Sequence, residues 1–226
     1  MAGATAIERP ASWGQRREEM IATASKLMSE GGYRAVSMER LAAELRVTKP
    51  TVYYYLDSKG GLWAALADLA ETNSARLREK CLELTDPAER LRAVIHESVE
   101  QSTGDMRWMS GLLDRDHFPD DLDTVVAERL NSAAQVWFHT VISTVRSAVA
   151  AEVLPELDPI LTALNLIAMS AWCAKWYRRD VDADPDQIED AILGLVLQSH
   201  SLQTHLATAP DARTRSRARK TSGRKP

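Results

Sequence analysis

Apolar residues recur along most of this chain at the three- and four-residue spacing of an amphipathic α-helix, and alternating strand patterns are absent. This spacing predicts a first helix over residues 12–30, a short second helix over 38–45 and a third over 49–56. Ser37 and Thr48 stand directly before the second and third helices, where a side-chain oxygen can accept from a backbone N–H and cap the helix. Three helices in close succession therefore open the chain.

The remaining pattern predicts longer helices as far as residue 206. Their expected ranges are 59–83, 88–103, 106–113, 121–153, 159–178 and 185–206. Residues 1–11 form a flexible polar arm, and residues 207–226 hold almost no apolar side chains, so we expect a disordered basic tail there. The sequence thus predicts an all-α chain with a small domain over 12–58 and a larger helical body over 59–206.

The composition favours a soluble protein of a reducing compartment. The 226 residues are 45% apolar, which is enough for a real core, and they include only two cysteines, Cys81 and Cys173. The longest apolar run, 160–174, is interrupted by polar residues and is too short for a membrane span. No secretory signal pattern is found at the N-terminus. We therefore expect a cytoplasmic protein that makes no use of a membrane.

Charge is unevenly distributed along the chain. Residues 1–80 hold 12 basic and 10 acidic side chains, residues 81–211 hold 9 and 22, and residues 212–226 hold seven basic side chains and no acidic one. Basic ends around an acidic middle indicate that only part of the chain approaches a polyanion. A solvated acidic body with a disordered tail explains the same distribution, so charge alone does not decide between the two interpretations.

The second and third predicted helices have the spacing of a helix-turn-helix motif, in which the second helix of the pair enters the major groove of DNA. Tyr53, Tyr54 and Tyr55 are consecutive, so on a helix they point about 100° apart and cannot all be buried. Exposed phenols beside a helix N-terminus with hydroxyls and a lysine favour contact with phosphates. Ordinary packing of an aromatic cluster is the alternative interpretation.

Residues 36–59 resemble the DNA-binding signature of the TetR/AcrR family of transcriptional regulators; they read VSMERLAAELRVTKPTVYYYLDSK. The family pattern has a Ser or Thr cap, a Leu-Ala pair, a Gly-Val-Thr turn, Leu-Tyr-x-His-Phe and a downstream Lys. Three positions depart from it: Arg46 replaces the turn glycine, Tyr55-Leu56 replaces His-Phe, and Gly60-Gly61 stands where helix formers are usual. The strong match spans 17–66, and the remainder agrees in length and helical layout.

The resemblance implies an N-terminal three-helix DNA-binding domain and a C-terminal helical body for ligand binding and dimerisation. Carried over by position, it implies base contacts, phosphate contacts and a cap near the backbone from Ser37, Thr48, Lys49, Pro50, Thr51, Tyr53, Tyr54, Tyr55 and Lys59. One such domain contacts few base pairs, so the partners we expect are a palindrome-like duplex operator and a second copy of the chain. The implied function is a ligand-responsive regulator, in the simplest case a repressor released by a small amphipathic effector.

Aromatic residues in the body suggest where the effector binds. The candidate pocket residues are Trp108, Leu112, Phe118, Trp137, Val141, Trp172, Trp176, Arg178 and Arg179. Core packing is the better explanation for any one of them, whereas the set together favours a pocket. The segment 172–179 weakly resembles acyl-CoA-sensing members of the family, in which case Arg178 and Arg179 would serve CoA phosphates. No other cofactor is expected.

The last two helices resemble the dimerisation pair of the family. The candidate interface is a stripe on the last helix, formed by Ile188, Ile192, Leu195, Val196 and Ser199. Plain intramolecular core is the alternative. Enzymatic functions find little support, because the five histidines have no metal-ligand spacing and no nucleophile or phosphate-loop motif is present. The loop 114–117 gathers titratable groups without a companion nucleophile. The competing class is therefore a helical ligand-binding or scaffold protein that does not read DNA.

Overall fold

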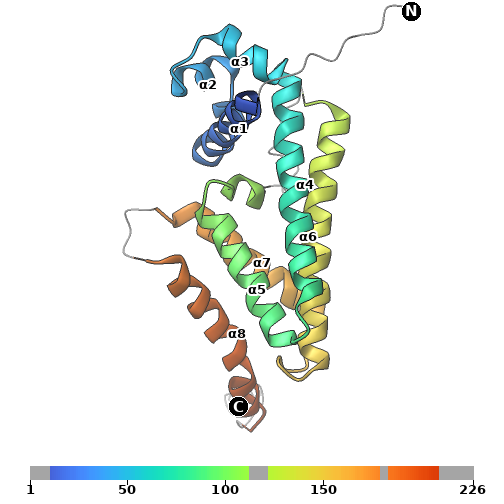
Figure 1. The fold of residues 1–226 in the computed structure, drawn as a ribbon. Helices are drawn as coiled ribbons and strands as arrows, with labels where there is room; N and C mark the ends of the chain where they lie inside the picture. The colour runs from blue at the N-terminus through green and yellow to red at the C-terminus, as the bar shows by residue number, and fades with distance from the viewer. Residues whose placement is uncertain (1–10, 112–121, 179–182, 209–226) are drawn as a thin grey trace, which may run out of the picture.

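The structure is a computed structural model that describes residues 11–111, 122–178 and 183–208, and it is built from α-helices and two short 3-10 helices (Figure 1). In chain order these are α1 Ala11–Gly31, η1 Tyr33–Ala35, α2 Met38–Glu44, α3 Lys49–Leu56, α4 Lys59–Glu83, α5 Pro87–Thr103, η2 Arg107–Gly111, α6 Thr124–Ala150, α7 Pro159–Trp176 and α8 Pro185–Thr208. Within these residues no strand occurs, so the prediction of an all-α chain is confirmed.

The helix boundaries follow from caps that are visible in the sequence. Aspartates 86, 123 and 158 each accept from the backbone N–H groups of the turn that follows, and they begin α5, α6 and α7. Several boundaries differ from the predicted ranges by one to three residues. The predicted helix over 106–113 is the 3-10 helix η2, which ends at Gly111, and α6 ends at Ala150, just before Glu152 takes a left-handed φ of 58°.

The first three helices form a compact unit around one apolar cluster. Met20 and Leu27 of α1 meet Leu41 of α2 and Val52 and Leu56 of α3, and all five side chains are buried. Short helices such as α2 and α3 are marginal by themselves, so the long apolar face of α1 is what stabilises them. This arrangement leaves the N-terminal turn of α3 on the outside of the unit.

The body continues directly from this unit through α4. The long helices α4 and α6 lie side by side, α5 crosses beside them against α7, and α8 packs on α5 (Figure 1). Trp63 and Leu66 of α4 share a cluster with Trp108 of η2 and Leu130 of α6, and the same cluster includes the core of the first three helices. The unit formed by α1, α2 and α3 therefore shares one continuous core with the adjoining parts of α4, η2 and α6. Among the described helices, none is long and apolar enough to cross a membrane.

Candidate functional site

The turn between α2 and α3 is built as the sequence predicts. The Ser37 hydroxyl accepts from the Arg40 N–H at 3.1 Å and caps α2. Thr48 caps α3, where its hydroxyl accepts from the Thr51 N–H at 3.4 Å. Arg46, which replaces the usual turn glycine, adopts a left-handed backbone with φ of 54°, a conformation that costs a non-glycine residue about 1–2 kcal/mol. The turn thus keeps its helix-turn-helix course without the glycine.

The outer face of α3 is exposed and polar. Thr48, Lys49 and Pro50 are exposed, and Tyr53 and Tyr54 are 39% and 60% exposed. The hydroxyls of Thr48 and Thr51 form a hydrogen bond of 2.7 Å, which orients both side chains at the N-terminal turn of α3. This face presents hydroxyls, phenols and a cation together, which is the chemistry that phosphate and base edges require.

Lys49 is held on this face by an acidic neighbour. Its ammonium forms an ion pair with Glu39 of α2 and lies 5.8 Å above the centre of the Tyr53 ring. The hydrogen bond between the two groups lowers the pKa of the Glu39 carboxyl and raises the pKa of the Lys49 ammonium. Glu39 therefore stays ionised and competes with any phosphate for Lys49.

Tyr55 differs from its two neighbours because it packs inward. Its ring stacks on Trp13 of α1 with centroids 5.6 Å apart, and Tyr54 meets the same ring edge-on at 5.1 Å. Tyr55 thus supports the orientation of Tyr54, in addition to the phosphate role that the family pattern implies. Lys59 is exposed at the first position of α4.

The glycine pair at the start of α4 has unequal roles. The Ser58 hydroxyl caps this helix by accepting from the Gly61 N–H at 3.0 Å. A Cβ on Gly61 would overlap the carbonyl oxygen of Leu56, whereas a Cβ on Gly60 would meet nothing closer than the Ser58 hydroxyl at 3.6 Å. Gly61 is therefore required for the close approach of α3 and α4.

A hydrogen-bonded latch joins α1 to the segment around η2. The buried Ser25 hydroxyl donates to the Asp105 carbonyl oxygen at 2.8 Å and accepts from the Trp108 indole N–H at 2.8 Å. Ser29 donates to the same Asp105 oxygen at 2.8 Å, and Arg107 donates to the Ser29 carbonyl oxygen at 3.0 Å. These hydrogen bonds, called the latch below, hold α1 and the unit formed by α1, α2 and α3 against the body.

A cavity of about 40 Å³ lies inside the body between α4, α5, η2, α6 and α7. Trp137 and Phe138 form one side, and serines from four elements line the rest, with Ser74 on α4 and Ser170 on α7. Its volume holds about three water molecules. In this form the cavity therefore admits a small group, not a whole large ligand.

Two surface depressions share lining residues with this cavity or with one another. A groove of about 580 Å³ between α1, η2 and α7 includes Trp108 and Trp172, and it shares Ser110 and Ala171 with the cavity. A polar recess of about 260 Å³ lies beside the groove; it shares Arg107 with the groove and adds Lys26 and Arg178. Recess, groove and cavity thus lie next to one another, close to the latch residues Arg107 and Trp108.

The structure divides the predicted pocket residues among different places. Trp137 lines the cavity, Trp108 and Trp172 line the groove, and Arg178 lines the recess. Val141 is fully buried in the lower core and does not border the cavity, which corrects its assignment to the pocket. Trp172 and Trp176 are 66% and 42% exposed on α7, so they do not form the enclosed aromatic pocket that we expected. Leu112, Phe118 and Arg179, like the loop 114–117, lie outside the described residues.

The residues predicted for the dimer interface also differ in how far they are exposed. Ile188, Ile192 and Val196 are buried within the same chain, as the intramolecular alternative expects, while Ile188 and Ile192 also border the apolar groove between α7 and α8. Leu195 is 67% exposed, and the side chain of Ser199 lies outside the described part. The exposed apolar residues lie beside this stripe: Trp172, Trp176 and Leu195 border an apolar groove of about 650 Å³ between α7 and α8.

One cluster offers ligand atoms suitable for a divalent cation. His96 of α5 and Asp186 and Glu189 of α8 have candidate ligand atoms within 4.8 Å of one another. However, Nδ1 of His96 lies 2.9 Å from one carboxylate oxygen of Glu189, and Arg92 lies 3.5 Å from the other. These pairs already satisfy the buried carboxylate, so the cluster is explained as a clamp between α5 and α8.

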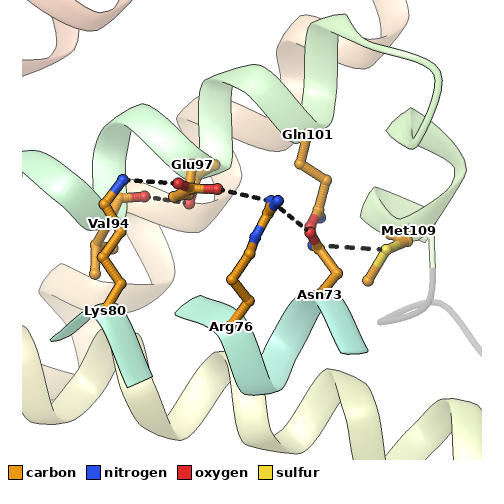
Figure 2. A network of polar contacts seen from close by, with 8 residues as sticks. Asn73, Arg76, Lys80, Val94, Glu97, Gln101 and Met109 are labelled. Carbon is orange, nitrogen blue, oxygen red and sulfur yellow. Dashed lines mark hydrogen bonds and ion pairs between the residues drawn. The ribbon is translucent and has the colours of Figure 1, made fainter. Parts of the chain in front are cut away.

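A polar network between α4 and α5 was not predicted from the sequence. The Asn73 amide donates to Gln101 at 3.0 Å and accepts from Arg76 at 3.0 Å (Figure 2). Glu97 then accepts from Arg76 at 3.2 Å and from Lys80 at 2.8 Å. Gln101 also borders the cavity, so the network connects α4 with the cavity wall. The polar residues on buried helix faces were the only signal of it in the sequence.

Family models match both halves of the chain. Residues 20–66 match the model of bacterial regulatory proteins of the tetR family, and residues 84–200 match a tetracyclin repressor-like C-terminal domain. The HTH-type transcriptional regulator HbdR of Aromatoleum sp. (strain CIB) is 32% identical over 78 residues, which are 34% of this chain and 34% of that protein. The match therefore spans about a third of that relative.

Solved structures of regulators share the fold. AibR in complex with isovaleryl coenzyme A and operator DNA superposes with a TM-score of 0.67 and 22% identity, over 80% of this chain and 98% of that one. FadR from Bacillus subtilis in complex with stearoyl-CoA superposes with a TM-score of 0.57 and 16% identity, over 80% and 97%. The chain belongs to the TetR family of transcriptional regulators, with a helix-turn-helix DNA-binding domain followed by a ligand-binding body.

Proposed function

We propose that this protein is a repressor that binds a palindrome-like operator as a homodimer and leaves it when an amphipathic effector binds the body. The observation that carries the proposal is the outer face of α3, where Thr48, Lys49 and Tyr54 stand exposed on a helix whose other side is buried. Base contacts are assigned to Thr48, Lys49, Pro50 and Thr51, and phosphate contacts to Tyr53, Tyr54, Tyr55 and Lys59, with Ser37 close to the backbone.

The dimer is assigned to the exposed apolar face of α7 and α8. Besides Trp172, Trp176 and Leu195, this face exposes Leu161 by 61% and Leu164 by 45%. Apolar side chains gathered in this way on a soluble chain are typical of a protein interface. A twofold pairing would place two copies of α3 on successive turns of one face of the duplex.

The proposed effector is an acyl-CoA, or another amphipathic ligand with an anionic end, bound in the recess and the groove. Lys26, Arg107 and Arg178 would hold an anionic end in the recess, which Glu30 and Asp105 also line. The groove past Trp108 and Trp172 would hold an apolar segment. Regulators of the same fold in complex with isovaleryl coenzyme A and with stearoyl-CoA support this choice of ligand.

Effector binding would be coupled to DNA binding because the groove lies beside the latch. Arg107 and Trp108 line the groove and also make the latch bonds to Ser29 and Ser25 of α1. A ligand that displaces them changes how the DNA-binding domain sits on the body. Release needs a preference of only a few kcal/mol for the altered state.

DNA binding is tested with the promoter region of the gene itself, by gel shift and by fluorescence anisotropy over a range of salt concentrations. Lys49→Ala and Tyr54→Phe are expected to weaken binding, and Lys49→Ala is expected to reduce the salt slope by about one ion per half-site. Arg146→Ala removes an exposed cation near the C-terminal end of α6, away from α3, and should leave the operator affinity and the salt slope unchanged. Equal affinity and slope in all four proteins would contradict the assignment of α3.

The dimer and the effector are tested separately. Leu195→Glu should yield a folded monomer in light scattering, whereas Ile192→Glu places a charge in the intramolecular core and should unfold the chain. A dimeric Leu195→Glu protein would contradict the assigned interface. For the effector, acyl-CoAs of several lengths, CoA and free fatty acids are titrated into the operator complex. Release by an uncharged compound alone would refute the CoA assignment and leave the coupling intact.

A further inference from the structure

One ion pair, between Glu39 and Lys49, joins the first turns of α2 and α3. Lys49 is the only charged residue of α3, and Glu39 is the acidic residue in the first turn of α2. Both side chains are exposed, Glu39 by 64% and Lys49 by 47%. An exposed ion pair contributes little to the stability of a fold, so the fold does not require this contact. Because Lys49 stands on the outer face of α3, the pair belongs to the surface that would meet DNA.

The pair cancels the charge of the first turn of α3. Binding of a protein to DNA of any sequence is driven by cations that replace counterions on the phosphates. Glu39 neutralises the one cation of α3, and its carboxylate is repelled by phosphates. The hydrogen bond from Lys49 lowers the pKa of the Glu39 carboxyl, so this negative charge is present at neutral pH. The first turn of α3 therefore gains little from phosphates alone.

The same pair offers hydrogen-bond donors and acceptors side by side. The Lys49 ammonium has three N–H groups and gives one of them to Glu39, and a carboxylate has more lone pairs than this bond uses. In the major groove, guanine presents the acceptors O6 and N7, and its paired cytosine presents the N4 donor. Lys49 can therefore donate to guanine while Glu39 accepts from the cytosine of the same base pair. Thymine offers the ammonium a single acceptor, O4, beside its methyl group, so an A·T pair fits less well.

We propose that Glu39 is a specificity-determining residue, which keeps Lys49 from phosphates and, together with Lys49, reads one G·C pair in each half-site. The proposal rests on the proposed function of α3 and names the base pair that its first turn prefers. Tyr53 supports the arrangement, because its ring centre lies 5.8 Å from the Lys49 ammonium and limits the directions that this side chain can take. Glu39 thus lowers the affinity for DNA in general and raises the share of it that depends on sequence.

The test compares two duplexes of equal length and composition, the operator from the promoter region of the gene and a shuffled version of it. The affinities of the wild type, Glu39→Gln and Lys49→Ala are measured by fluorescence anisotropy over a range of salt concentrations. Glu39→Gln is expected to tighten binding to the shuffled duplex more than binding to the operator. The ratio of the two affinities should fall about five- to a hundredfold, which is the range of one specific base contact. The salt slope on the shuffled duplex should rise by about one ion for each copy of α3.

Glu44→Gln is the matched control. It removes the same charge from the same helix, but Glu44 pairs with Lys26 of α1 at 3.9 Å instead of with Lys49. We expect this variant to change both affinities alike and to leave their ratio unchanged. The base pair is then identified by replacing each G·C pair of the operator with A·T in both half-sites. At one position the wild type and Glu44→Gln should lose affinity, whereas Glu39→Gln and Lys49→Ala should lose little.

Three results would overturn the proposal: an unchanged ratio in Glu39→Gln, an equal fall of the ratio in Glu44→Gln, or loss of base preference at different positions in Glu39→Gln and Lys49→Ala. If the wild type is specific for the operator and Glu39→Gln has the same ratio, the proposal fails and the proposed function of α3 stands. If the wild type binds both duplexes equally, the proposed function of α3 is contradicted and the proposal fails with it.

Discussion

The hydrogen bonds of the latch between the DNA-binding domain and the body contribute to the free energy of unfolding by an amount that can be estimated. Ser25→Ala removes the hydrogen-bond acceptor of the Trp108 indole N–H, and Trp108 is only 7% exposed. A buried donor that loses its acceptor costs about 1–3 kcal/mol. The Asp105 carbonyl oxygen keeps its bond from Ser29, so it contributes little to the loss. We therefore expect Ser25→Ala to lower the free energy of unfolding by about 1–3 kcal/mol.

A double-mutant cycle isolates the indole contribution. In a Trp108→Phe background no N–H is left to be orphaned, so Ser25→Ala should cost less there, with a coupling energy of about 1–2 kcal/mol. The assay is urea unfolding followed by circular dichroism at one fixed protein concentration, because dimerisation shifts apparent stability. Ser29→Ala serves as the control. Its hydroxyl makes an exposed hydrogen bond to the Asp105 carbonyl oxygen and a longer one, at 3.4 Å, from the Trp108 backbone N–H, so its loss should cost less than Ser25→Ala. An identical cost of Ser25→Ala in both backgrounds would refute the reasoning.

Two further predictions concern the DNA-binding domain. Gly61→Ala should destabilise it and weaken operator binding, because the new Cβ meets the backbone of α3, whereas Gly60→Ala should be neutral or stabilise the protein by up to about 1 kcal/mol; thermal melting that ranks the two variants the other way would contradict this. Glu39→Gln should tighten operator binding and steepen its salt dependence, since the carboxylate no longer competes for Lys49; weaker binding in an anisotropy titration would show that the ion pair positions Lys49 productively.

Local signals in the sequence were sufficient for the helices and for the DNA-binding domain. Caps such as Ser37 and Thr48 act within one turn, so their effect can be deduced without knowledge of the fold. The consecutive tyrosines were also informative, since a helix cannot bury three successive positions. Which one turns inward, Tyr55, depended on Trp13 of another helix and could not be deduced.

Assignments in the body failed where they depended on what covers a helix face. A stripe of apolar residues predicts that a face is buried, but not whether the cover is the same chain or a partner. Ile188, Ile192 and Val196, which were predicted to lie in the dimer interface, are buried in the single chain, and of these three Ile188 and Ile192 also border the groove between α7 and α8. Trp172 and Trp176 were assigned to a closed pocket for the same reason, although they lie on the surface. The serine-lined cavity gave no signal, because its hydroxyls come from elements far apart in the sequence.

We propose that this chain reads DNA through α3 as a symmetric dimer. This proposal is tested most directly by selecting bound duplexes from a random library and sequencing them, once with the wild-type protein and once with Thr48→Ala. For the wild type we expect an enriched motif with two inverted half-sites. For the variant we expect a weaker base preference at the positions that Thr48 contacts. Recovery of no motif, or of a single half-site without a symmetric partner, would contradict the account.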